Sequence, residues 1–144
     1  MQLSYRRLNN CSGLLMFCVA AVVYCMTIEP TASFWDCGEF ITSAYKLEVG
    51  HPPGAPFFML TANFFTSLTG DTALVARMVN YMSALMSAAT IMFLFWTITH
   101  LTRKLLIKEG EPLSLSQTIT IIGAGTVGSL AYTSSDTFWF SAVA

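Results

Sequence analysis

The sequence predicts an all-α integral membrane protein with about three transmembrane helices and amphipathic juxtamembrane helices in its first outer loop. Of the 144 residues, 54% are hydrophobic and only 10% carry a charge, whereas roughly a quarter are charged in a typical soluble domain. The charged residues leave four uncharged runs, at 8–28, 49–70, 78–102 and 112–135. A bilayer span needs about 20 mostly apolar residues, so the first, third and fourth runs qualify.

The first run predicts a span over about 11–28, directly after the basic pair Arg6 and Arg7. An N-terminal apolar run can also be a secretory signal, and Thr31-Ala32-Ser33 offers a small-residue cleavage site. The run is longer than the apolar part of an ordinary signal, and further spans follow it. Both features favour an uncleaved membrane helix.

The outer loop, residues 29–77, begins with a predicted amphipathic helix over about 34–48. Its polar residues recur at spacings of three, four and three, which places them in one stripe: Asp36, Glu39, Ser43 and Lys46. The apolar residues are expected to face the other way: Phe34, Cys37, Ile41, Ala44 and Tyr45. Such a helix suits the boundary between membrane and water. Gly50 and the proline-rich residues 51–56 end it.

The second uncharged run predicts a short helix over about 56–69. Its apolar part, 57–68, has only 12 residues, and this length suits an interfacial or re-entrant helix better than a span. Asp71 and Thr72 then form a plausible cap for the next helix, which is predicted to span the membrane over about 78–101. Arg77 near its outer end is either a snorkelling anchor or a partner for a phosphate.

The fourth run predicts a span over about 114–133 and also contains a dinucleotide-binding pattern. Gly123, Gly125 and Gly128 match G-x-G-x-x-G, which in a nucleotide-binding fold belongs to a βαβ unit with an acidic residue about 20 positions further on. This sequence has no acid at that distance, and the pattern lies in an apolar run. Small residues four apart, Ala124 with Gly128 and Gly125 with Ser129, instead suit close packing between membrane helices.

The positions of the basic residues predict which loops face inward. Five of the seven Lys and Arg residues lie in two short segments: Arg6 and Arg7, and Arg103, Lys104 and Lys108. Short basic loops stay on the cytoplasmic side, so the N-terminus and residues 103–111 are expected inside. The loop 29–77 and the residues from Ser134 onward, including Asp136, are then expected outside.

Local structural roles compete with chemistry for several polar residues. Ser33 and Asp36 match the S-x-x-D form of a capping box, in which the acid serves the helix start. Glu39, one turn further along, has no such role. Cys37 is expected to pack as a small side chain, and the three cysteines of the first span lie too far apart along one helix to form disulfides.

Four segments together resemble one family: W-D-C-G-E at 35–39, A-Y-K-L-E-V-G-H-P-P-G-A-P at 44–56, Arg77, and S-S-D-T-F-W-F-S-A-V at 134–143. The chain resembles the bacterial relatives of the transmembrane protein O-mannosyltransferases, which were long catalogued as a domain of unknown function within the GT-C class of membrane glycosyltransferases. Members of this class are much longer. The resemblance therefore implies that residues 1–144 form a single GT-C-like membrane domain, the N-terminal part of a longer chain.

The resemblance implies transfer of a sugar, with mannose as one candidate, from a polyprenyl-phosphate carrier to a protein or glycan hydroxyl at the outer membrane face. By similarity, Asp36 would be the general base and Glu39 its catalytic neighbour. Two carboxylates one helical turn apart would also raise each other's proton affinity. Four further residues would bind substrate: His51, Lys46, Arg77 and Asp136. No metal ligand set is recognisable, and the residue pattern leaves the need for a divalent metal open.

The expected partners are the lipid bilayer, the lipid-linked sugar donor and the acceptor. No basic, aromatic-rich patch indicates nucleic acid. The expected location is the bacterial inner membrane, with residues 29–77 on the periplasmic side. Two other interpretations remain open: a small non-enzymatic membrane protein whose outer loop binds a partner, and a transporter fragment in which Asp36 and Glu39 are intramembrane cation ligands.

Overall fold

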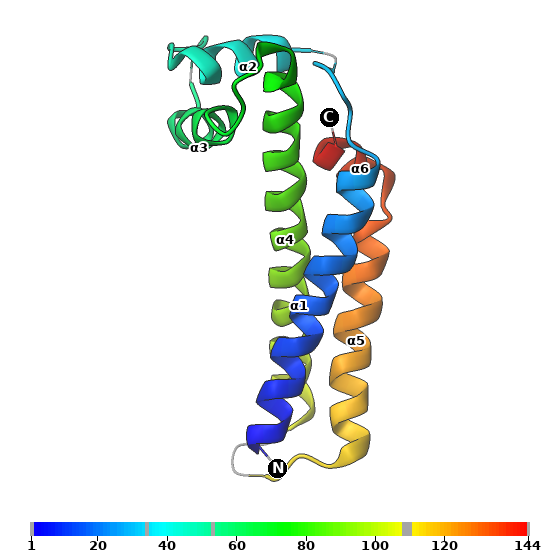
Figure 1. Cartoon of the computed structure of the whole chain (residues 1–144). Coiled ribbons are helices and arrows are strands. Elements are labelled where there is room, and N and C mark those ends of the chain that lie inside the picture. Colours follow the sequence, from blue (N-terminus) through cyan, green and yellow to red (C-terminus); the bar gives the residue numbers. More distant parts are fainter. Residues whose placement is uncertain (1, 34, 53, 108–110, 144) are drawn as a thin grey trace. The chain divides into compact units, whose positions relative to one another are not determined.

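The computed structural model describes residues 2–33, 35–52, 54–107 and 111–143, and within them it is helical without strands (Figure 1). The elements are α1 (Gln2–Met26), α2 (Cys37–Lys46), α3 (Pro56–Thr66), the 3₁₀ turn η1 (Thr72–Leu74), α4 (Val75–Leu106), α5 (Leu115–Thr133) and α6 (Asp136–Val143). The predicted all-α fold class is confirmed. The chain divides into two compact units, which we call the bundle unit (Met1–Val23 and Ser87–Trp139) and the loop unit (Tyr24–Met86 and Phe140–Ala144).

The long helices are longer than the predicted spans. α1 begins nine residues before the predicted start at 11, and α4 extends beyond 78–101 at both ends. Arg6 and Arg7 lie on α1 as exposed residues. A charged residue ends an apolar run, but the helical hydrogen bonds continue through it. The uncharged runs therefore underestimated the lengths of both helices. Lys108 of the predicted inner loop lies outside the described residues.

Two helices in the described part of the chain are long and apolar enough to cross a membrane: Tyr5–Met26 and Thr72–Leu106. α5 is a helix of 19 residues, as predicted, and its crossing of the bilayer stays a prediction. It begins at a capping box, in which Ser114 Oγ accepts from the Gln117 N–H at 3.2 Å and Gln117 Oε1 accepts from the Ser114 N–H at 2.9 Å. The S-x-x-Q pattern of a capping box is a sequence signature of a helix N-terminus.

Small residues let helices of the bundle unit approach closely. A Cβ added to Gly125 of α5 would lie 2.5 Å from Thr99 Cγ2 and 2.9 Å from Phe95 Cε2 of α4, and Gly128 is similarly close to Ile98. Ser129, four residues after Gly125, is fully buried. The predicted small-residue packing is confirmed. The glycine pattern lies inside α5, and no strand precedes it in the described residues, so its setting is not the βαβ unit of a dinucleotide-binding fold.

In the loop unit, α2 and α3 pack on the first turns of α4 around an apolar cluster. Its buried members are Ile41, Ala44, Met59, Ala62, Val75, Val79 and Met82. α3 has 11 residues, or about 16 Å at 1.5 Å per residue, too short to cross a hydrocarbon core of about 30 Å. Phe57, Leu60 and Phe64 are 79%, 65% and 62% exposed. This apolar stripe fits the predicted interfacial helix.

The bounds of α2 differ from the predicted 34–48, and Phe34 itself lies outside the described residues. α2 ends at Lys46 because Leu47 adopts a left-handed conformation at φ 54°. The Glu48 N–H then bonds to the Ser43 carbonyl at 2.8 Å and the Leu47 N–H to the Ala44 carbonyl at 3.3 Å, which together form a Schellman motif. The chain therefore reverses three residues before Gly50.

The predicted faces of α2 are partly wrong. Ser43, expected in the polar stripe, is 7% exposed, whereas Tyr45, expected on the apolar face, is 41% exposed. The reason is the reversal at Leu47, because residues 48–51 return over the side of α2 that carries Ser43. The α3 helix ends at Thr66 rather than 69, and residues 67–69 continue as turns.

Candidate functional site

An imidazole lies between two carboxylates in the loop unit. His51 Nδ1 is 2.9 Å from Glu39 Oε2, and the backbone N–H of His51 donates to Glu39 Oε1 at 2.8 Å. On its other side, His51 Nε2 is 3.9 Å from Asp36 Oδ2. The structure therefore brings together three predicted site residues, with His51 as the link between Asp36 and Glu39.

The backbone reversal after α2 creates this arrangement. Residues 48–51 pass so close to α2 that a Cβ on Gly50 would lie 3.3 Å from Glu39 Oε1 and 3.9 Å from Ser43 Oγ. A second turn follows, in which the Gly54 N–H donates to the His51 carbonyl at 3.0 Å and Gly54 has a positive φ of 73°. Glycine at 54 allows this conformation at little cost. His51 is thus fixed by turns on both sides.

The charges of the cluster reinforce one another. The hydrogen bond that the His51 ring donates to Glu39, followed by the negative charges of Glu39 and Asp36, raises the pKa of His51 above its usual value. The backbone N–H and then the ring of His51 lower the pKa of Glu39. The expected mutual rise in proton affinity of the two acids is therefore wrong for Glu39. Both carboxylates therefore stabilise the protonated form of His51 relative to the neutral form.

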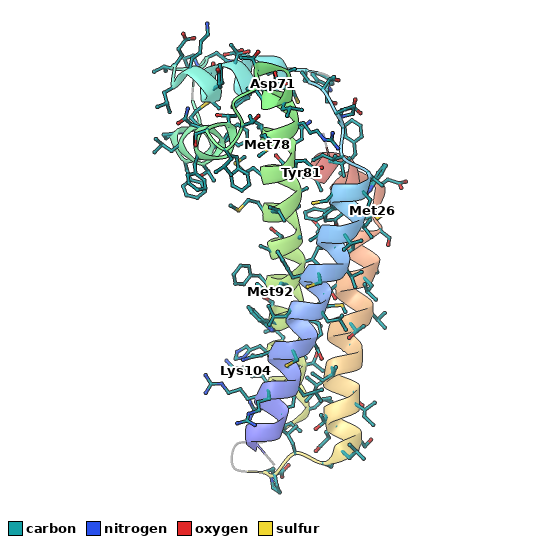
Figure 2. All side chains as sticks on the ribbon, viewed as in Figure 1. Met26, Asp71, Met78, Tyr81, Met92 and Lys104 are labelled. Atoms are coloured by element: carbon teal, nitrogen blue, oxygen red, sulfur yellow. The ribbon has the colours of Figure 1, made fainter. Side chains whose placement is uncertain are left out.

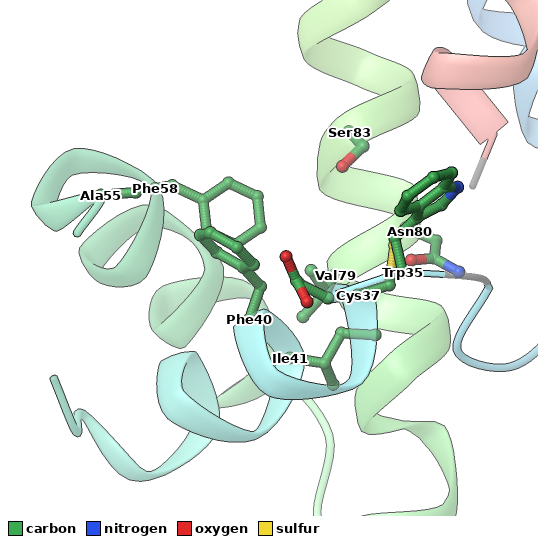
Figure 3. Close-up of a pocket in the computed structure, with 10 residues that line it drawn as sticks. Trp35, Cys37, Phe40, Ile41, Ala55, Phe58, Val79, Asn80 and Ser83 are labelled. Atoms are coloured by element: carbon green, nitrogen blue, oxygen red, sulfur yellow. The ribbon is translucent and has the colours of Figure 1, made fainter. Parts of the chain in front are cut away.

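Asp36 also lines a largely apolar pocket within the loop unit, with a volume of about 410 Å³. The pocket lies between α2, α3 and the first part of α4 (Figure 3). Its walls are Trp35, Asp36, Cys37, Phe40, Ile41, Ala55, Phe58, Val79, Asn80 and Ser83. The Phe40 ring meets both Phe58 and His51 edge to face, at centroid distances of 5.7 and 6.0 Å. Phe40 thus connects the pocket to the charged cluster.

The capping role considered for Asp36 is wrong. Asp36 stands at the N-cap of α2 rather than inside it, and its side chain accepts no capping hydrogen bond. Its side chain is 65% exposed. Asp71, labelled in Figure 2, does act as a cap, although of η1, the 3₁₀ turn directly before α4, and not of α4 itself: its Oδ1 accepts from the Ala73 N–H at 2.9 Å. Asp36 is therefore available for another task.

Asn80, which was not among the predicted site residues, is 3% exposed. Its Nδ2 donates to the carbonyls of Glu29 and Thr31 at 2.9 and 3.1 Å. Asn63 acts in the same way on α2, where its Nδ2 donates to the carbonyls of Ala44 and Tyr45. An amide inside an otherwise apolar helix was the available signal, because a buried amide needs partners.

Two other predicted site residues of the loop unit, Lys46 and Arg77, make no hydrogen bond or ion pair with the Asp36–His51–Glu39 cluster. Lys46 is exposed at the end of α2. Arg77 is exposed, stacks over Tyr81 at 5.6 Å and donates to the Tyr81 hydroxyl at 3.3 Å. Asp136 begins α6 in the bundle unit. Substrate contacts by these three residues stay predictions. Among the described residues, no three His, Cys, Asp or Glu side chains are grouped to hold a metal ion.

Several features fit a membrane protein. Two apolar helices have spanning length, the short helix α3 exposes an apolar stripe, and a charged cluster lies beside a pocket. A family model described as "Protein O-mannosyl-transferase TMEM260 N-terminal domain" matches residues 36–144. The chain belongs to this family, so the family predicted from the sequence motifs is confirmed, whereas its bacterial origin stays a prediction. The matched region begins at Asp36.

Two curated relatives carry the corresponding name. The chain is 32% identical over 85 residues to "Protein O-mannosyl-transferase tmem260" of Dictyostelium discoideum, covering 58% of this chain and 10% of the relative. It is 36% identical over 87 residues to "Protein O-mannosyl-transferase TMEM260" of Mus musculus, covering 60% of this chain and 12% of the relative. The aligned region is thus about a tenth of each relative. No solved structure matches.

Proposed function

We propose that this chain supplies the base-bearing outer loop of a membrane glycosyltransferase, with Asp36 as the general base. The enzyme moves a sugar from a polyprenyl-phosphate donor to a hydroxyl of a protein or glycan. The observation that carries the proposal is the position of Asp36: its carboxylate is exposed, lines a pocket, and opens the region shared with the family. The names of the relatives support mannose as the sugar.

The reaction requires a proton acceptor next to the acceptor hydroxyl. Asp36 takes the hydroxyl proton as the oxygen attacks the anomeric carbon of the donor sugar. The new bond is carbon to acceptor oxygen, and the broken bond joins the anomeric carbon to the phosphate oxygen. The electron pair leaves with the polyprenyl phosphate, so charge and atoms balance. A positioned base contributes about 10²- to 10⁴-fold to such a step.

The loop has the properties that such a reaction at a membrane surface needs. The donor has an apolar tail and a polar head, and α3 exposes apolar side chains close in sequence to the charged cluster. The basic residues Arg6, Arg7, Arg103 and Lys104 favour an inward location for their own segments. By the same rule, residues 29–77 are on the outer face, where the acceptor is modified.

The test uses the full-length protein in membranes from cells that lack it. Polyprenyl-phosphate [³H]mannose is the donor probe, and incorporation into endogenous protein is measured, with mass spectrometry to find hexose on Ser or Thr. Asp36→Asn keeps the size of the side chain but cannot take a proton. Transfer should fall by about 10²- to 10⁴-fold at an unchanged protein level.

Glu48→Gln is the matched control, since Glu48 is another exposed acid of the same loop. It should transfer mannose at the wild-type rate. Wild-type transfer by Asp36→Asn would remove Asp36 as the base. No mannose transfer by the wild-type protein, with hexose absent from its acceptors, would reject the glycosyltransferase assignment itself and favour a loop that only binds a partner.

A further inference from the structure

We infer that His51, held in place by Glu39, is a positioning residue whose imidazolium orients the Asp36 carboxylate and balances its charge. The inference rests on the proposed function of Asp36 and deepens it, because it makes the same site dependent on a second titrating group. It also assigns Glu39 a different task from that of a second catalytic acid.

Glu39 holds His51 at two points. One carboxylate oxygen accepts the backbone N–H at 2.8 Å and the other contacts ring Nδ1 at 2.9 Å. These bonds join residues 12 positions apart, and they fix both the main chain and the ring. Edge contact with Phe40 limits the ring further. A histidine bound in this way presents Nε2 in one direction, as an imidazole does when a carboxylate holds its other nitrogen.

That direction is toward Asp36. The distance of 3.9 Å between Nε2 and Oδ2 is within the range of an ion pair but too long for a hydrogen bond. The protonated ring of His51 thus places a positive charge beside Asp36. The carboxylate oxygens of Asp36 can still accept a hydrogen bond from the hydroxyl of the acceptor substrate. This is the geometry that a base needs: it is oriented by charge and still able to take a proton.

The groups around His51 determine how the arrangement responds to pH. Glu39 lies on α2 and Asp36 at its N-cap, and both favour the imidazolium. α3, which packs against α2, has no titratable side chain along Pro56–Thr66. In the first turns of α4, the charged group is Arg77, which is held on Tyr81. Because the pKa of His51 is raised, the imidazolium persists above the usual range and is lost as pH rises further.

The inference predicts an alkaline limb in the pH profile of transfer that belongs to His51. Glu39→Gln keeps an oxygen to accept the backbone N–H but removes the negative charge, so the limb should move to lower pH. His51→Gln should lose about 10- to 100-fold in transfer, the effect typical of removing a partner that orients a functional group, and it should lose the limb. His51→Arg keeps a cation at every working pH, so it should restore transfer and also abolish the limb.

The experiment measures these pH profiles in the full-length protein with polyprenyl-phosphate [³H]mannose. His100→Gln is the matched control, because His100 is the other histidine of this chain and lies in the bundle unit. Its profile should equal that of the wild type. If His51→Gln retained the wild-type alkaline limb, or if His51→Arg were as inactive as His51→Gln, the positioning role would be overturned.

A second measurement does not need activity. Diethylpyrocarbonate modifies neutral imidazole, and mass spectrometry of the peptide containing His51 follows its modification against pH. The midpoint should move to lower pH in Glu39→Gln and stay at the wild-type value in Glu48→Gln. An unchanged midpoint in Glu39→Gln would overturn the inference. If the midpoint moves but Asp36→Asn transfers normally, the contact exists and the proposed base has failed, so the two failures are distinguishable.

Discussion

The internal packing of the bundle unit depends on different interactions from the internal packing of the loop unit. In the bundle unit, contacts such as Gly125 against Phe95 and Thr99 depend on the absence of a side chain. In the loop unit, side-chain amides and a carboxylate bond to distant backbone groups, as Asn80 does to Glu29 and Thr31. Close apolar packing is set by residue size, whereas polar anchoring specifies where a chain without regular structure must lie. The first suits a helix bundle in lipid, and the second suits a loop that positions charged side chains.

The largest stability effect is expected where the bundle packing is tightest. Gly125→Val introduces a side chain whose first carbon would already overlap Thr99 and Phe95, so it should destabilise the protein by about 1–3 kcal/mol, the usual cost of overpacking. Gly123→Val is the matched control, since nothing lies within 4 Å of a Cβ there. Thermal midpoints in detergent measure the difference. Equal midpoints would contradict close packing at Gly125.

The next effect tests the polar anchoring of the loop unit. Asn80→Leu keeps the approximate size but removes the donor to two carbonyls, and an unpaired buried polar group costs about 1–3 kcal/mol. Residues 29–31 should become more sensitive to protease, although the Glu29 N–H keeps its bond to the Val143 carbonyl at 2.9 Å. Asn10→Leu changes an exposed asparagine and should leave the cleavage rate unchanged. Equal cleavage in both variants would show that Asn80 does not anchor the loop.

A smaller effect of opposite sign is expected at Leu47. A left-handed conformation costs a residue with a side chain roughly 1–2 kcal/mol, and glycine avoids this cost but loses about 0.5–1 kcal/mol to its greater freedom when unfolded. Leu47→Gly should therefore stabilise the loop unit by at most about 1.5 kcal/mol. Leu47→Ala keeps the strain and should not stabilise. Hydrogen exchange at the Glu48 amide compares them, and faster exchange in Leu47→Gly would contradict the strain argument.

The smallest stability effect concerns pH, because both partners of the Glu39–His51 contact are exposed. The pKa of Glu39 is lowered, so its contribution is complete above its ordinary value and is lost as pH falls through the lowered value. The pKa of His51 is raised, so its contribution is complete below its ordinary value and is lost as pH rises through the raised value. Protease cleavage within residues 47–52, measured with a pH-tolerant protease, should be slowest between these limits. Glu39→Gln should remove this dependence, and a dependence that persists in it would assign the effect to other groups.

The sequence by itself determined the features that depend on neighbouring residues. Apolar runs predicted the long helices, their small residues predicted the packing of Gly125 and Ser129, and Asp71 was recognisable as a cap. The W-D-C-G-E and H-P-P-G-A-P motifs indicated the family before any contact was known. These features have short-range causes, namely hydrogen-bond periodicity, side-chain size and local capping.

Only the tertiary structure decided how the site is assembled. Glu39 and His51 meet because Leu47 adopts a backbone conformation that a leucine rarely takes, and no local pattern announces such a residue. Asn80 donates to carbonyls about fifty positions earlier in the chain. These bonds require the first turns of α4 to lie beside residues 29–31. In both cases contacts made elsewhere offset the local cost in conformational energy and loop-closure entropy. The sequence therefore predicted which charged side chains belong to the candidate site, but it did not predict that Glu39 and His51 pair.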